Sequence, residues 1–181
     1  GYDHKYTYSH IGYNLKITDW QAAIALAQLE KLDSFLARRR KNAEVLMSKL
    51  ERFGEYLILP KIEAKCSPSW FGFLISVREN APWTKFEMVE YLERHGIGTR
   101  QLFAGNILRQ PMFTTAAVPV RIGAGELKLS NELSEADYAK LPATEFIMNN
   151  TFWVGVAQNI DENDVLRTAE TIEKFISEKA K

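Results

Sequence analysis

The spacing of apolar residues changes abruptly at Gly54, and this change limits the folds open to the chain. Before it, Thr18-Asp-Trp-Gln21 has the spacing of a capping box, and apolar residues then recur near helical period as far as Phe53. After it come short aromatic and β-branched runs bounded by proline and charged residues, which are typical of strands. We expect a long N-terminal helix, as two collinear segments or kinked near Asp33, followed by helices on a mainly antiparallel sheet. This is the α+β class.

The sequence after Gly54 alternates between strand and helix signals. Strands are predicted at 56–60, 70–77 and 151–156, and helices are predicted to begin at Thr84, Ser134, Pro142 and Asp161. The last helix would place Val165, Ala169, Ile172 and Ile176 on one buried face. We therefore divide the chain into an extended segment (1–17), a linking helix (18–53) and a small α+β domain (54–181).

One long segment shows neither the helical nor the strand pattern of apolar residues. From Gln101 to Leu127 the only charged residues are Arg109, Arg121 and Glu126, and glycines and prolines interrupt the run. Loops of this length are uncommon unless they are functional or disordered, and the aromatic content argues against disorder. We expect an ordered binding loop in preference to a passive connector.

The composition excludes several classes of function. Lys plus Arg and Asp plus Glu both number 23, so overall charge favours neither nucleic acid nor a membrane surface as a partner. The single cysteine, Cys66, can form neither an intrachain disulfide nor an all-cysteine metal site, which favours a reducing compartment, the cytoplasm by default. No apolar stretch is long enough to span a bilayer, and no signal peptide opens the chain. The absence of an initial methionine fits a fragment, a processed product, a chain whose beginning is not included or an engineered start.

The motifs of several catalytic classes are also absent. The sequence has no HExxH or CxxC metal spacing, no phosphate-binding P-loop, no dinucleotide fingerprint and no GxSxG elbow, so we predict no metal site. Polar donors gather instead in two irregular segments. They suit an anionic or hydroxyl-rich ligand, but from the residues alone we favour the interpretation that they cap turns and bind backbone carbonyls. These donors are His10, Tyr13, Asn14 and Lys16 in the first segment, and Arg100, Asn106 and Arg109 in the second.

Several strings together resemble one known family. The run Ser9-His-Ile-Gly-Tyr-Asn-Leu-Lys-Ile-Thr-Asp-Trp-Gln-Ala-Ala23, with Ala27-Gln-Leu-Glu-Lys-Leu32, is similar to the sugar aminotransferase and dehydratase family of fold-type-I pyridoxal-phosphate enzymes. Lys16 stands where many members carry arginine. Three further strings look most like the branch of 3-dehydratases that acts on CDP-linked 4-keto-6-deoxyhexoses in lipopolysaccharide O-antigen biosynthesis. They are Gly96-Ile-Gly-Thr-Arg100, Phe103-Ala-Gly-Asn-Ile-Leu-Arg-Gln-Pro111 and Asn150-Thr-Phe-Trp-Val-Gly155.

The resemblance implies that the chain is the C-terminal part of such an enzyme, with segment 1–17 coming from the end of the large domain. The catalytic lysine or histidine would lie upstream, so this portion alone would be inactive. The cofactor implied is pyridoxamine or pyridoxal 5′-phosphate, and members similar to residues 1–16 often also hold a [2Fe–2S] cluster upstream. A homodimer and a flavin iron–sulfur reductase are the implied partners.

The resemblance also assigns roles to the polar donors. Asn14 matches the asparagine that reaches across the dimer to the cofactor phosphate, and His10, Tyr13 and Lys16 flank it. The second segment matches a loop facing the nucleotide-sugar, which makes Arg100, Asn106 and Arg109 candidate substrate contacts. The rival readings are a sugar aminotransferase of the same family and a non-catalytic dimerising module.

Overall fold

The computed structural model describes residues 12, 13 and 15–180, which fall into two compact units divided between Ser34 and Phe35. The first unit contains helix α1 (Asp19–Leu29). The Thr18 hydroxyl accepts a hydrogen bond from the Gln21 amide at 3.4 Å, and the Gln21 side chain accepts one from the Thr18 amide at 2.9 Å. The predicted capping box is therefore confirmed.

The predicted linking helix is interrupted after α1. The chain turns at Glu30 and Lys31, and α2 (Leu32–Leu50) then continues into the 3₁₀ turn η1 (Glu51–Phe53). Buried side chains on α2 are confined to its C-terminal half, where they join the core of the second unit. The division of the chain into three segments stays a prediction.

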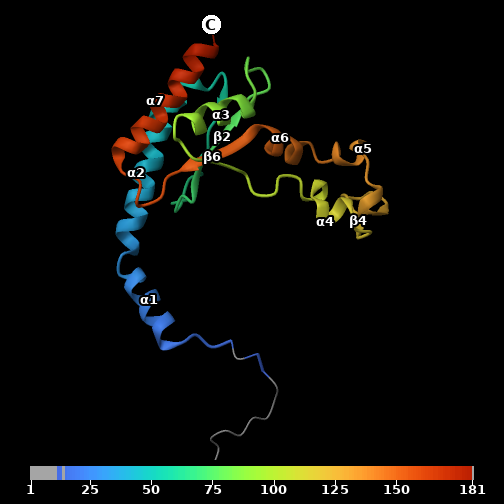
Figure 1. The fold of residues 1–181 in the computed structure, drawn as a ribbon, viewed down its shortest axis with the longest axis horizontal. Helices are drawn as coiled ribbons and strands as arrows, with labels where there is room; N and C mark the ends of the chain where they lie inside the picture. Colours follow the sequence, from blue (N-terminus) through green and yellow to red (C-terminus); the bar gives the residue numbers. More distant parts are fainter. Residues whose placement is uncertain (1–11, 14, 181) are drawn as a thin grey trace, which may run out of the picture. The chain divides into compact units, whose positions relative to one another are not determined.

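The second unit is built on a four-stranded antiparallel sheet with the order β1-β2-β6-β3. Its two central strands, β2 and β6, are labelled in Figure 1. The strands are β1 (Leu57–Ile58), β2 (Gly72–Val77), β3 (Thr99–Gln101) and β6 (Thr151–Gly155). The predicted strands at 70–77 and 151–156 are confirmed, and the one predicted at 56–60 is present as a single pair of residues. The predicted α+β class with a mainly antiparallel sheet is also confirmed.

Helices cover one face of this sheet. Because side chains alternate along a strand, Phe73, Ile75 and Val77 of β2 all point into the core, as do Phe152 and Val154 of β6. Helices α2, α3 (Lys85–Arg94) and α7 (Glu162–Lys179) supply the opposite wall. The predicted buried face of α7 is confirmed, with Phe175 added to it. The other face of the sheet, which α2, α3 and α7 do not cover, is here called the open face.

The segment between β3 and β6 forms a second small layer. Residues 106–141, here called the outer lobe, contain η2 (Ile107–Arg109), α4 (Pro111–Thr114), the hairpin β4 (Pro119–Arg121) and β5 (Leu127–Leu129), η3 (Ser130–Glu132) and α5 (Glu135–Tyr138). Helix α6 (Pro142–Asn150) leads from the lobe back to β6 (Figure 1). The predicted loop is thus ordered, but it holds a hairpin that the sequence did not indicate.

Among the described residues, no helix combines the length and the apolar character that crossing a membrane requires.

Candidate functional site

Arg109 lies at the centre of a charged cluster that joins the outer lobe to α6. Its two terminal nitrogens donate to the Glu135 carboxylate at 2.7 and 2.6 Å, and its Nε and Nη2 donate to Glu145 at 3.1 and 2.8 Å. The guanidinium also lies 4.1 Å from the ring centroid of Tyr138. Hydrogen bonding to Glu135 and Glu145 raises the pKa of Arg109, and the same bonds lower the pKa of both carboxyls. The guanidinium is therefore held on both edges and on one face.

Asn106 belongs to the same cluster. It is 1% exposed, its Nδ2 donates to Glu145 Oε1 at 2.6 Å, and its Oδ1 accepts from the Leu108 amide at 3.1 Å, capping η2. The structure thus brings two of the predicted site residues together on one glutamate. Sequence reasoning missed Glu145, although it is the only charged residue between Lys140 and Asp161. This isolation in the sequence was the feature that could have identified Glu145 as a candidate site residue.

Arg100 lies apart from this cluster, on β3. It is exposed, it stands directly opposite Trp153 in the β3–β6 register, and its Nη1 donates to its neighbour's carbonyl, Thr99 O, at 2.8 Å. Directly opposed residues in an antiparallel pair project from the same face of a sheet. Since Trp153 alternates with the buried Phe152 and Val154, Arg100 stands on the open face.

A buried lysine lies at the edge of the sheet near Arg100. Lys85, the first residue of α3, is 1% exposed, and its ammonium donates to Gln101 Oε1 at 2.7 Å and to the Met148 carbonyl at 2.6 Å. Burial lowers the pKa of Lys85, because removal from water penalises the charged form. The lysine links α3, β3 and α6. It follows Thr84 directly at a helix start, a place where lysine is ordinarily exposed, so nothing in the sequence indicates its burial.

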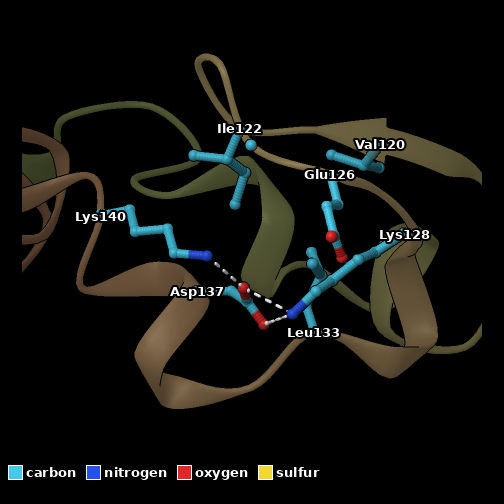
Figure 2. A pocket seen from close by; sticks show the side chains of 8 residues that line it. Val120, Ile122, Glu126, Lys128, Leu133, Asp137 and Lys140 are labelled. Carbon is cyan, nitrogen blue, oxygen red and sulfur yellow. Dashed lines mark hydrogen bonds and ion pairs between the residues drawn. The ribbon is translucent and has the colours of Figure 1, made fainter.

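The outer lobe has a polar cluster of its own, beside a cavity of about 320 Å³ (Figure 2). Figure 2 shows Lys128 and Lys140 pointing toward Asp137 from two sides. Their Nζ atoms lie 2.9 and 2.8 Å from Asp137 Oδ1. Asp137 also accepts hydrogen bonds from the Ser134 amide and hydroxyl. These partners, Lys140 first, hold the pKa of Asp137 well below its usual range. The cluster ties α5 to the β4–β5 hairpin.

The predicted site residues of the first segment are only partly described. His10 and Asn14 lie outside the described residues, whereas Tyr13 and Lys16 are exposed, Tyr13 at 91%. Within residues 12–13 and 15–180 no three His, Cys, Asp or Glu side chains gather as they would around a metal ion.

Comparison with solved structures identifies the fold. A structure titled E. coli GDP-4-keto-6-deoxy-D-mannose-3-dehydratase with bound hydrated PLP aligns over 92% of this chain and 38% of its own, with a TM-score of 0.69 and 24% sequence identity. The fold described here is thus one found in the fold-type-I pyridoxal-phosphate enzymes.

Sequence comparison then places the chain in a family. Residues 1–173 match the DegT/DnrJ/EryC1/StrS aminotransferase family, and the chain belongs to it. It is 43% identical over 175 residues to the lipopolysaccharide biosynthesis protein RfbH of Salmonella typhimurium, covering 97% of this chain and 36% of that protein. It is 39% identical over 177 residues to the dTDP-4-dehydro-2,6-dideoxy-D-glucose 3-dehydratase of Saccharopolyspora spinosa, covering 98% and 34%. The chain therefore spans about a third of the length of these curated relatives.

Proposed function

We propose that this chain is the C-terminal portion of a nucleotide-sugar 3-dehydratase that removes the 3-hydroxyl of a 4-keto-6-deoxyhexose. The observation that carries the proposal is the 39% identity to a 3-dehydratase along 98% of the chain. The similarity to a lipopolysaccharide biosynthesis protein supports a place in O-antigen synthesis, in the cytoplasm. The 3-dehydratase branch that the sequence resembles acts on CDP-linked sugars, and this favours CDP as the nucleotide of the substrate.

In this proposal the chain contributes substrate positioning. Arg100 is the exposed cation on the open face, and a guanidinium binds phosphate oxygens directionally. Asn106 and Arg109 hold the start of the outer lobe through Glu145, so they fix the loop that would face the sugar. Their direct contact with substrate stays a prediction.

The cofactor, pyridoxamine or pyridoxal 5′-phosphate, would meet the first segment of the chain. Its phosphate would be held by Asn14 from the neighbouring subunit of a homodimer, with His10, Tyr13 and Lys16 beside it. An amide, a phenol and an ammonium suit phosphate oxygens, and the exposure of Tyr13 and Lys16 leaves both able to reach another surface. When bound, the cofactor supplies the electron sink for loss of the hydroxyl. The catalytic lysine or histidine, and any [2Fe–2S] cluster, would lie in the part of the relatives that this chain does not span.

Replacement of Asn14 tests this arrangement. In the complete protein that contains this chain, Asn14→Ala should release the cofactor roughly tenfold more readily while the dimer persists, because one charge-assisted hydrogen bond is lost. Cofactor absorbance after gel filtration reports retention, and light scattering reports the dimer. Full retention of the cofactor would remove Asn14 from the site.

The second candidate is a sugar aminotransferase, which the name of the matching family favours. The complete protein, incubated with a CDP-linked 4-keto-6-deoxyhexose, distinguishes the two by the mass of the product. Loss of one oxygen atom from the sugar, through loss of water followed by two-electron reduction by an added flavin iron–sulfur reductase, identifies the dehydratase. Gain of nitrogen from glutamate identifies the aminotransferase. If neither product forms and the protein is a stable dimer, the remaining interpretation is a non-catalytic dimerising module.

A further inference from the structure

Three aromatic side chains meet on the open face of the sheet. The ring centroid of Phe71 lies 5.1 Å from that of Trp153 and 6.4 Å from that of Phe103. Phe71 is 66% exposed and Phe103 is 78% exposed, although both are large apolar residues in contact with other rings. We call these three residues the aromatic shelf. They come from the approach to β2, the turn after β3 and the middle of β6.

The backbone around the aromatic shelf has two close glycine contacts and one non-glycine residue in a left-handed conformation. A Cβ on Gly72 would lie 2.4 Å from Trp153 Cε3, so the Trp153 ring can lie across β2 only because residue 72 is glycine. Phe103 has a φ of 47°, a left-handed conformation that is unfavourable for a bulky residue. The same turn is fixed by Gly105, where a Cβ would lie 2.5 Å from Met148 Cγ. The turn that carries Phe103 is therefore packed closely against Met148.

A cation accompanies the shelf. Arg100 projects from the same face as Trp153, directly opposite it in the register. Within the described residues its guanidinium makes one hydrogen bond, to the Thr99 carbonyl, and no ion pair. By contrast, Arg109 donates to two carboxylates. An arginine with remaining donors beside flat apolar rings suits a ligand that is both planar and anionic.

We infer that the aromatic shelf binds the nucleobase of a nucleotide and that Arg100 binds its phosphates. Every nucleobase has a π-face, so exposed rings can stack on it, and the guanidinium can take the attached diphosphate. This inference rests on the proposed function, because it places the nucleotide half of the sugar-linked substrate. It goes further by naming Phe71, Phe103 and Trp153 as the surface that the base contacts.

Calorimetric titration of the complete protein with CDP, dTDP and GDP tests the inference. Phe103→Ala should weaken binding of the preferred nucleotide about tenfold, since stacking on one aromatic residue typically contributes that much, and Phe103→Tyr should restore it. Leu127→Ala is the control, because Leu127 on β5 is 61% exposed and lies outside the shelf, and it should leave affinity unchanged. Arg100→Gln should weaken pyrophosphate and nucleotide binding but leave the corresponding nucleoside unaffected.

Two results would overturn the inference. One is no measurable binding of any of the three nucleotides by the wild-type protein. The other is unchanged nucleotide affinity in Phe103→Ala. Turnover is measured separately. If the protein turns over its substrate but the shelf variants leave nucleotide affinity unchanged, only the inference is refuted. If nucleotide binding depends on the shelf but neither dehydration nor amination occurs, only the proposed function is refuted.

Discussion

At the scale of single residues, Glu145 determines what its neighbours can do. It is 19% exposed and receives hydrogen bonds from both Asn106 and Arg109. The guanidinium of Arg109 is additionally shared with Glu135. Because these donors are engaged within the chain, their first effect is to hold the outer lobe against α6. Any contact with substrate would be made by a group already fixed in direction.

Exchanging the Asn106 amide for an acid tests that role. Asn106→Asp would set a second carboxylate against Glu145 in a buried position, where the present amide donates at 2.6 Å. We expect a loss of about 1–3 kcal/mol of stability at neutral pH, partly recovered in mild acid as a carboxyl protonates. Urea unfolding at two pH values measures it, with the exposed Asn131→Asp as control. Unchanged stability with impaired substrate binding would instead make Asn106 a direct contact.

The polar residues of the candidate site differ in how readily the sequence indicates them. Asn106 and Arg109 stand out because polar donors are rare in their low-charge segment. Arg100 stands out through the string that carries the family resemblance. Lys85 could not be found, because its burial arises from tertiary packing between α3, β3 and α6, far apart in the chain. Periodicity reports which face of an element is apolar, and not where two distant elements enclose a charge.

At the scale of elements, the helix starts were predictable because their stabilising bonds are local. Thr84 caps α3 by accepting from the Glu87 amide, and the Glu87 carboxylate accepts from the Thr84 amide at 2.8 Å in return. Hydrogen bonds from the Thr84 amide first, then from the Lys179 ammonium and the Thr84 hydroxyl, lower the pKa of Glu87 to about 2. The β4–β5 hairpin was not predictable, because each strand has three residues and neither reaches the core. Its position depends on the ion pair between Lys128 of β5 and Asp137, a residue that lies outside the hairpin.

The hairpin should therefore respond to acid through Asp137. A lowered folded-state pKa means that the carboxylate stabilises the lobe fully above the ordinary value near 4, and that this stabilisation is lost as pH falls through the lowered value. In Asp137→Asn, Lys128 and Lys140 lose their shared counter-charge. We expect roughly tenfold faster amide exchange in residues 119–129 of this variant at neutral pH, and a weaker dependence on acid.

Hydrogen exchange followed by NMR makes the measurement. The control is Asp164→Asn, which removes an exposed carboxylate paired with Arg167 on α7 and should leave the hairpin unchanged. Equal exchange in wild type and Asp137→Asn would show that apolar packing, and not the ion pairs, holds the hairpin.

At the scale of the whole molecule, the second unit is closed by contacts between its beginning and its end. Asn42 on α2 is 1% exposed, and its Nδ2 donates to the carbonyls of Ala157 and Ile160 at 3.2 and 3.1 Å. It therefore satisfies the irregular backbone that joins β6 to α7. A buried carbonyl without a donor is costly, so this one amide supports a connection between elements more than a hundred residues apart.

Removing that amide should weaken the unit as a whole. Asn42→Ala is expected to cost about 1–3 kcal/mol, seen as a lower urea midpoint with an unchanged slope. Asn80→Ala, which removes an exposed hydrogen bond to the Glu55 carbonyl, should cost less than about 0.5 kcal/mol. A change in slope for Asn42→Ala would indicate that the unit no longer unfolds in one step.

The strand order also dictates when the protein can take shape during its synthesis. Strand β6 separates β2 from β3 and is hydrogen-bonded to both, yet it is made last of the three. A chain still on the ribosome that has reached only the outer lobe has no partner for β3, and Phe73 and Ile75 have one wall of their core missing. Sheets built from such distant segments close slowly and expose apolar surface meanwhile. Newly made chains should thus depend on chaperones until Thr151–Gly155 has emerged.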